Sequence, residues 1–146
     1  MSKLGRRLQS AGPKGGTLYI TPATDTYSNG STLTITIREN SGSVPVNAVQ
    51  ANLSYPTNRL QFQSISTSTS AFTTSLQETG GGGTVQIGVG ILGNSVTGDA
   101  IVATVTFQAI GAGAAAVQFT AGSGIAATAD SSDICKQRTG ANYTIS

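Results

Sequence analysis

The sequence predicts an all-β fold, a sandwich of two packed antiparallel sheets with about nine strands. Apolar and polar residues alternate with a period of two in several short segments, which places one side of each segment in a core and the other in water. Only 10% of the residues are charged. Thr and Ser are frequent instead, and they suit exposed strand faces better than exposed helices.

Residues 46–62 show this pattern most clearly. In the first strand, residues 46–55, the apolar side chains alternate with polar ones. Pro56 then breaks the strand because it has no N–H to donate to a ladder, and the alternation resumes at residues 60–62. The residues expected to face the core are Val49, Ala51, Leu53, Tyr55, Leu60 and Phe62, and those expected in water are Gln50, Asn52 and Ser54.

The remaining strands follow from the same alternation in chain order. In residues 32–37 the apolar positions are strictly spaced, and in residues 99–110 Val102 is expected on the outward side together with Thr104 and Thr106. The other predicted strands are residues 17–20, 84–89, 114–120, 125–129 and 143–145. Turns or loops are predicted at residues 27–31, 39–43, 56–58, 80–83, 94–98 and 111–113, a loop or edge segment at 66–74, and a charged loop at 130–140.

Residues 1–16 are predicted to be a basic, flexible N-terminal arm, and residues 17–146 a single sandwich domain. Four of the eight basic residues lie in the arm, and no acidic residue precedes Asp25. Two leucines spaced by four allow about one amphipathic turn. The arm is either a disordered tail or cloning remnant, or a segment that orders on a partner. Its candidate contact residues are Lys3, Leu4, Arg6, Arg7, Leu8 and Lys14.

The chain lacks the residues of common active sites. It contains no histidine, which excludes Ser-His-Asp and Cys-His catalysis and the commonest metal sites. Asp130 and Asp133 are the only carboxylates close in sequence, and their spacing favours an Asx-type turn over a calcium site. We therefore predict no enzyme, no cofactor and no metal.

Two further motifs are interpreted as structural. Residues 88–93 match G-x-G-x-x-G but precede no helix, so they predict a loosened strand end or bulge and no phosphate site. Cys135 has no partner for an internal disulfide because it is the single cysteine, and a surface or edge position is expected. There is no tryptophan and the tyrosines lie mostly at inward positions, which disfavours a sugar-stacking platform.

Three segments resemble the cohesin domain family. They are residues 30–35, residues 46–55 followed by Leu60 and Phe62, and residues 98–107. The resemblance implies a jelly-roll sandwich, immunoglobulin-like in general architecture, in the same fold group as several carbohydrate-binding modules. Cohesins that bind dockerins of the first type usually carry Asn and Asp on the strand leading to the Tyr. Ala48 and Gln50 stand there, so a charge-assisted acceptor is missing.

These observations predict a non-enzymatic structural or adhesion module that docks on a larger assembly through its arm. The leading hypothesis is an accessory virion protein, such as a phage capsid-decoration or tail protein. The alternative is a secreted bacterial surface module, cohesin-like, that binds protein or carbohydrate. We expect a virion, extracellular or cell-surface location, and no signal peptide, because residues 1–16 lack an apolar core segment.

The expected partner is a protein assembly, namely a capsid, a tail or a surface scaffold. Self-association and carbohydrate binding stay open, whereas specific nucleic-acid binding and membrane insertion are not expected, because four charges without aromatics are weak evidence and no apolar span occurs. Within the sandwich, Gln50 and Asn52 are the candidate contact residues. They belong to a candidate polar surface made of Thr32, Thr34, Thr36, Gln50, Asn52 and Ser54.

Overall fold

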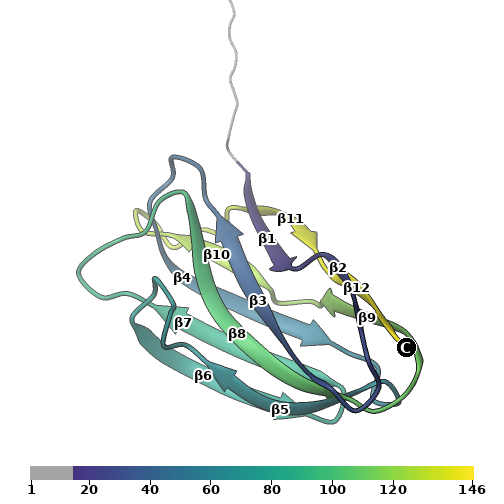
Figure 1. Ribbon diagram of the computed structural model, residues 1–146. Coiled ribbons are helices and arrows are strands. Elements are labelled where there is room, and N and C mark those ends of the chain that lie inside the picture. Colours follow the sequence, from purple (N-terminus) through teal and green to yellow (C-terminus); the bar gives the residue numbers. More distant parts are fainter. Residues whose placement is uncertain (1–14) are drawn as a thin grey trace, which may run out of the picture.

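The structure, a computed structural model, describes residues 15–146 and confirms the all-β sandwich (Figure 1). Most of the predicted arm, with all six of its candidate contact residues, lies outside the described residues. The described part of the chain forms twelve strands: β1 (Gly16–Thr21), β2 (Thr24–Tyr27), β3 (Thr32–Asn40), β4 (Val46–Ser54), β5 (Leu60–Ser66), β6 (Thr74–Gly81), β7 (Thr84–Gly90), β8 (Asp99–Ala109), β9 (Gly113–Phe119), β10 (Gly124–Ala127), β11 (Cys135–Thr139) and β12 (Ala141–Ile145).

The strands form two sheets that pack face to face. The smaller sheet has the order β11-β1-β3-β8-β5, and the larger has the order β2-β12-β9-β4-β7-β6, with β10 also paired to β4. Nine strands were expected, and the three additional ones are β2, β6 and β11. Each of these is the edge strand of its sheet and is mostly exposed. An edge strand with little buried surface shows no apolar alternation, which is why the sequence did not reveal them.

The sheets are mixed, which corrects the expectation of purely antiparallel sheets. β1 pairs with β11 and β2 pairs with β12 in parallel. Both parallel pairs arise because the chain crosses from the smaller to the larger sheet twice. It crosses between β1 and β2 near the start of the domain, and between β11 and β12 near its end. Gly140 makes the second crossing, where a Cβ would lie 2.3 Å from the carbonyl oxygen of Val117.

The core contains most of the inward residues that the alternation predicted. Leu33, Ile35 and Ile37 of β3 are buried, and the ring of Phe107 of β8 packs in a tilted arrangement against that of Tyr55, with 5.0 Å between the ring centroids. Strong apolar burial on both inner faces is what stabilises a sandwich without a disulfide.

The outward position expected for Val102 is wrong. Ile37 pairs with Ala103, whereas the next residue, Arg38, pairs with Ile101, so Val102 is the extra residue of a β-bulge in β8. The bulge lets Val102 and Ala103 both be buried. A period of two cannot anticipate such a change of phase. The described residues include no helix long and apolar enough to cross a membrane.

A candidate partner-binding face

The predicted polar surface is divided between two opposite faces of the sandwich. Thr32, Thr34 and Thr36 lie on β3 in the smaller sheet, whereas Gln50 and Asn52 lie on β4 in the larger one. The two sheets present their outward side chains to opposite sides. The candidate site therefore reduces to the outer face of the larger sheet, around Gln50 and Asn52.

A chain of side-chain amides crosses this face. The Nε2 group of Gln50 donates to Oδ1 of Asn52 at 2.8 Å and to Oε1 of Gln77 at 3.0 Å. Nε2 of Gln77 in turn donates to Oε1 of Gln86 at 3.3 Å. The amides thus connect β4, β6 and β7, and their mutual hydrogen bonds hold the side chains in fixed positions on the surface.

A hollow of about 290 Å³ lies beside the amides. It exists because the outward residue of β7 at this point is Gly88 and because the neighbouring residues Ala48 of β4 and Ala126 of β10 are also small. A Cβ at Gly88 would lie 2.8 Å from Oε1 of Gln50. The complete lining is Ala48, Val49, Gln50, Leu76, Gly88, Val89, Gly122, Gly124, Ile125, Ala126, Ser131 and Asp133.

Leu76 forms part of the rim of the hollow and is 67% exposed. The register of β6 against β7 shifts between Ser75 and Gln77, so Leu76 is the extra residue of a bulge. The G-x-G-x-x-G segment, residues 88–93, thus contributes Gly88 to the hollow. The bulge lies in the neighbouring strand, β6. Leu76 and Gln77 were missed because β6 was not predicted, whereas Gln86 lies at an outward position of the predicted strand 84–89.

The strands that build this face carry almost no charge. Among β4, β6, β7, β9, β10 and β12 there is one charged residue, Glu78. Its carboxylate accepts hydrogen bonds from Ser75 at 2.6 Å and from Thr67 at 3.3 Å. Thr67 follows β5, so Glu78 is held at the edge toward the smaller sheet. The expected absence of a carboxylate at Gln50 therefore extends to the strands around the amides, whereas the carboxylate of Asp133 lines the other end of the hollow.

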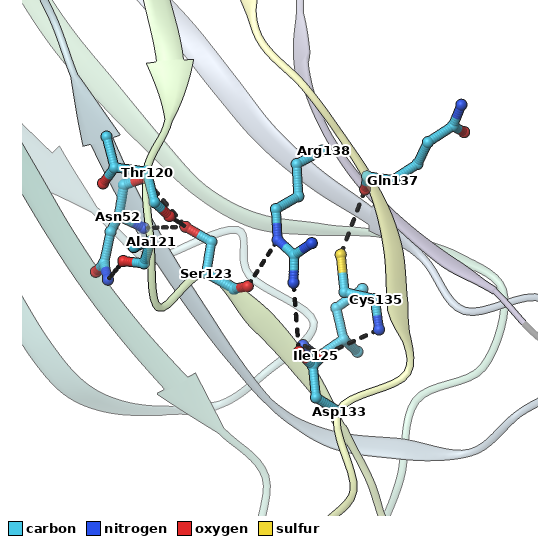
Figure 2. A network of polar contacts seen from close by, with 9 residues as sticks. All are labelled: Asn52, Thr120, Ala121, Ser123, Ile125, Asp133, Cys135, Gln137 and Arg138. Atoms are coloured by element: carbon cyan, nitrogen blue, oxygen red, sulfur yellow. Dashed lines mark hydrogen bonds and ion pairs between the residues drawn. The ribbon is translucent and has the colours of Figure 1, made fainter.

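A polar network fixes one end of the hollow (Figure 2). Oδ1 of Asp133 accepts the backbone N–H groups of Ile125 at 3.0 Å and Cys135 at 2.9 Å, and Oδ2 accepts from Arg138 at 3.3 Å. Arg138 also donates through Nε to the carbonyl of Ser123 at 2.8 Å. Partial burial alone would raise the pKa of Asp133. These N–H groups and Arg138 outweigh that effect and lower the pKa below its ordinary value.

Ser123 and Asn52 join this network to the amide chain. Ser123 is buried, and its hydroxyl accepts from the N–H of Asn52 at 2.9 Å and donates to the carbonyl of Thr120 at 2.9 Å. Nδ2 of Asn52 donates to the carbonyl of Ala121 at 3.0 Å. Asn52 is thus mainly a positioning residue, which anchors both the β9–β10 connection and Gln50.

The two remaining sequence motifs are structural. Oδ1 of Asp130 accepts from the N–H of Ser132 at 3.0 Å, and Ser131 has a φ of 62°, which confirms the Asx-type turn. Cys135 lies on edge strand β11 as expected, but its side chain is buried and not at the surface. Burial raises the pKa of the Cys135 thiol.

The family model of the cohesin domain matches residues 18–146. The chain belongs to the cohesin domain family. The match covers all twelve strands except the first two residues of β1, so the whole sandwich is one cohesin domain. The resemblance inferred from residues 30–35, 46–55 and 98–107 is thereby confirmed. No curated protein sequence matches the chain.

Solved cohesin structures have the same fold at low sequence identity. A cohesin module of Clostridium acetobutylicum is 17% identical, with a TM-score of 0.75 over 90% of this chain and 91% of that one. A non-cellulosomal cohesin of the archaeon Archaeoglobus fulgidus is also 17% identical, with a TM-score of 0.73 over 90% and 91%. The third ScaC cohesin of Acetivibrio cellulolyticus, in complex with the ScaB dockerin, is 10% identical, with a TM-score of 0.70 over 89% and 98%.

Proposed function

We propose that this cohesin domain is a non-catalytic protein-binding module and that its partner binds the outer face of β4, β6 and β7. One observation carries the proposal: a hollow with a floor of small residues lies beside an ordered chain of amides and an exposed leucine. Sites of this composition combine an apolar pocket with directional hydrogen-bonding groups, which is the usual arrangement at the centre of a protein interface.

The dimensions of the hollow favour a side chain as its occupant. About 290 Å³ accommodates one large apolar side chain of a partner. Covering Leu76, which is 67% exposed, would add about 2 kcal/mol of apolar burial. The amides of Gln50, Gln77 and Gln86 would then bind backbone or side-chain groups around that anchor.

We propose a dockerin as the partner, because a cohesin of the same fold is seen in complex with a dockerin. The contact would be made chiefly by neutral groups, since the only charged residue of the strands that carry the amides is Glu78 at the edge, and the Asp133 carboxylate at the end of the hollow is already paired with Arg138. Neutral contacts are screened little by salt. Binding by this domain should accordingly change little between low and high ionic strength.

The virion hypothesis depends on residues 1–16, of which residues 1–14 lie outside the described residues, and it stays a prediction. The virion or cell-surface location, carbohydrate binding and self-association also stay predictions. An arm that docks on an assembly is compatible with a partner bound on the sheet, because the arm precedes β1 in the smaller sheet.

Binding measurements on the full chain test the proposal. The chain is immobilised and a panel of dockerin modules is passed over it, with calcium and with a chelator. The Gly88→Val variant adds a side chain to the floor of the hollow, where a Cβ would lie 2.8 Å from Oε1 of Gln50, and the matched control Thr34→Val alters the opposite face. We expect at least about a tenfold loss for Gly88→Val, equivalent to about 1.4 kcal/mol, and none for Thr34→Val.

Two results would count against the proposal. If none of the dockerins binds, the partner class is wrong. If a dockerin binds but both variants bind it as well as the unmodified chain, the partner is correct and the proposed face is wrong.

A further inference from the structure

Glu39 is a carboxyl group inside the core of the sandwich. It follows Leu33, Ile35 and Ile37 on the inward side of β3, and its exposed fraction is 0%. Its strand neighbours are Leu18 of β1 and Ala100 of β8. Neither oxygen of Glu39 has a hydrogen-bond partner among the described residues. An ionised carboxylate in such a place is expensive, whereas the neutral acid costs much less.

Two loops meet beside Glu39. Residues 41–45 follow β3, and residues 91–98 precede β8. The N–H of Ser41 donates to the carbonyl of Gly98 at 3.1 Å, and the N–H of Gly98 donates to that of Gly42 at 2.9 Å. Val46 and Val96 exchange two further backbone bonds, at 2.9 and 2.8 Å. Ser41 is fully buried, so these loops close that end of the sandwich.

Few other groups near Glu39 can titrate. The two loops, with the sequences SGSVP and ILGNSVTG, contain no ionisable side chain. On the neighbouring strands the ionisable groups are Arg38 of β3, Asp99 of β8 and Tyr19 of β1. Arg38 pairs with Asp99 at 3.0 Å, and Tyr19 donates to the same carboxylate. These three satisfy one another on the outer side of the smaller sheet.

We propose that Glu39 is a proton-controlled latch: while its carboxyl is neutral the loops 41–45 and 91–98 stay closed, and loss of the proton opens them. A carboxylate needs hydrogen-bond donors, and water reaches it most directly where the two loops separate. Burial raises the pKa of Glu39 to about 7. Asp99 adds to the rise, and it is opposed by Arg38 and by the nearby hydroxyl of Ser41, which donates to the carbonyl of Gly98 at 3.4 Å and not to Glu39. The latch therefore works near neutral pH.

The loops also connect to the hollow. Residues 41–45 lead into β4, and residues 91–98 follow β7, and both strands line the hollow. Opening of the latch should then change how the face receives its partner. This regulatory step rests on the function proposed above, whereas the opening of the loops does not.

Amide hydrogen exchange on the full chain, without any partner, tests the latch. Exchange is measured at Ser41, Val46, Val96 and Gly98 in the unmodified chain and in Glu39→Gln, near pH 6 and near pH 8. Dividing the exchange rate of the unmodified chain by that of Glu39→Gln at each pH removes the intrinsic pH dependence of exchange. We expect the ratio to rise about tenfold over this interval, because the open state releases the proton more readily. An unchanged ratio would overturn the proposal.

A second measurement keeps the proposal testable if Glu39→Gln does not fold. The side-chain carboxyl carbon of Glu39 is followed by NMR through a pH titration of the unmodified chain. A midpoint near 7 supports the latch. A midpoint near the ordinary value of 4.5 means that the carboxylate is tolerated in the closed state and overturns it. Failure of every dockerin to bind would leave both results unaffected.

Discussion

Glu39 should make the global stability of this domain fall as the pH rises. In the folded state burial raises the pKa of Glu39 to about 7, whereas its ordinary value is 4.5. Well below 4.5 the group is protonated in both states, so its ionisation takes nothing from the stability. As the pH rises toward 7 the unfolded chain ionises first, so the folded state loses stability progressively. With 1.36 kcal/mol per pKa unit the full loss is about 3 kcal/mol.

The assay is urea denaturation of the unmodified chain and of Glu39→Gln at a series of pH values between about 4 and about 8. Gln has nearly the same shape but does not ionise. The difference in unfolding free energy between the two proteins should therefore shift by about 3 kcal/mol in favour of the variant as the pH rises. Parallel pH profiles for the two proteins would refute the argument, because they would show that Glu39 ionises without cost in the folded state.

Two other substitution or labelling experiments test single features of the fold. Gly140→Ala should destabilise the domain by about 1–3 kcal/mol in urea denaturation, because its Cβ would lie 2.3 Å from the Val117 oxygen. Gly88→Ala is the matched control with a small effect, and an equal loss in both would mean that the crossing at Gly140 can relax. Cys135, which is buried and whose thiol pKa burial raises, should react with a thiol reagent only after unfolding. Rapid labelling of the native chain would contradict its placement in the core.

The sequence predicts the central strands of this fold well because their burial is periodic. Leu33, Ile35 and Ile37 must face the core if Thr32, Thr34 and Thr36 are to face water. Edge strands lack that constraint. β11, with the sequence CKQRT, buries only its first residue, so it looks like a charged loop. The bulge at Val102 is invisible for a related reason, since it arises from pairing with β3 and not from the local sequence.

The candidate site was predictable only in part. Outward positions on β4 gave Gln50 and Asn52 directly. Nothing in the sequence, however, indicated that Thr34 and Gln50 lie on opposite faces, because that depends on which sheet each strand joins. The hollow depends on residues from four strands meeting at Gly88, and one of these strands, β6, was not predicted. Glu39 looked like the start of a loop, and its burial appears only once β1 and β8 are paired on either side.

The most direct test of the central claim is hydrogen exchange of the domain with and without a bound dockerin. A partner on the outer face of the larger sheet should protect residues 74–90, which include the bulge at Leu76 and the hollow at Gly88, together with β4. Residues 32–40 of the smaller sheet should be unchanged. Protection of residues 32–40 with no change at 74–90 would contradict the account and place the partner on the opposite face.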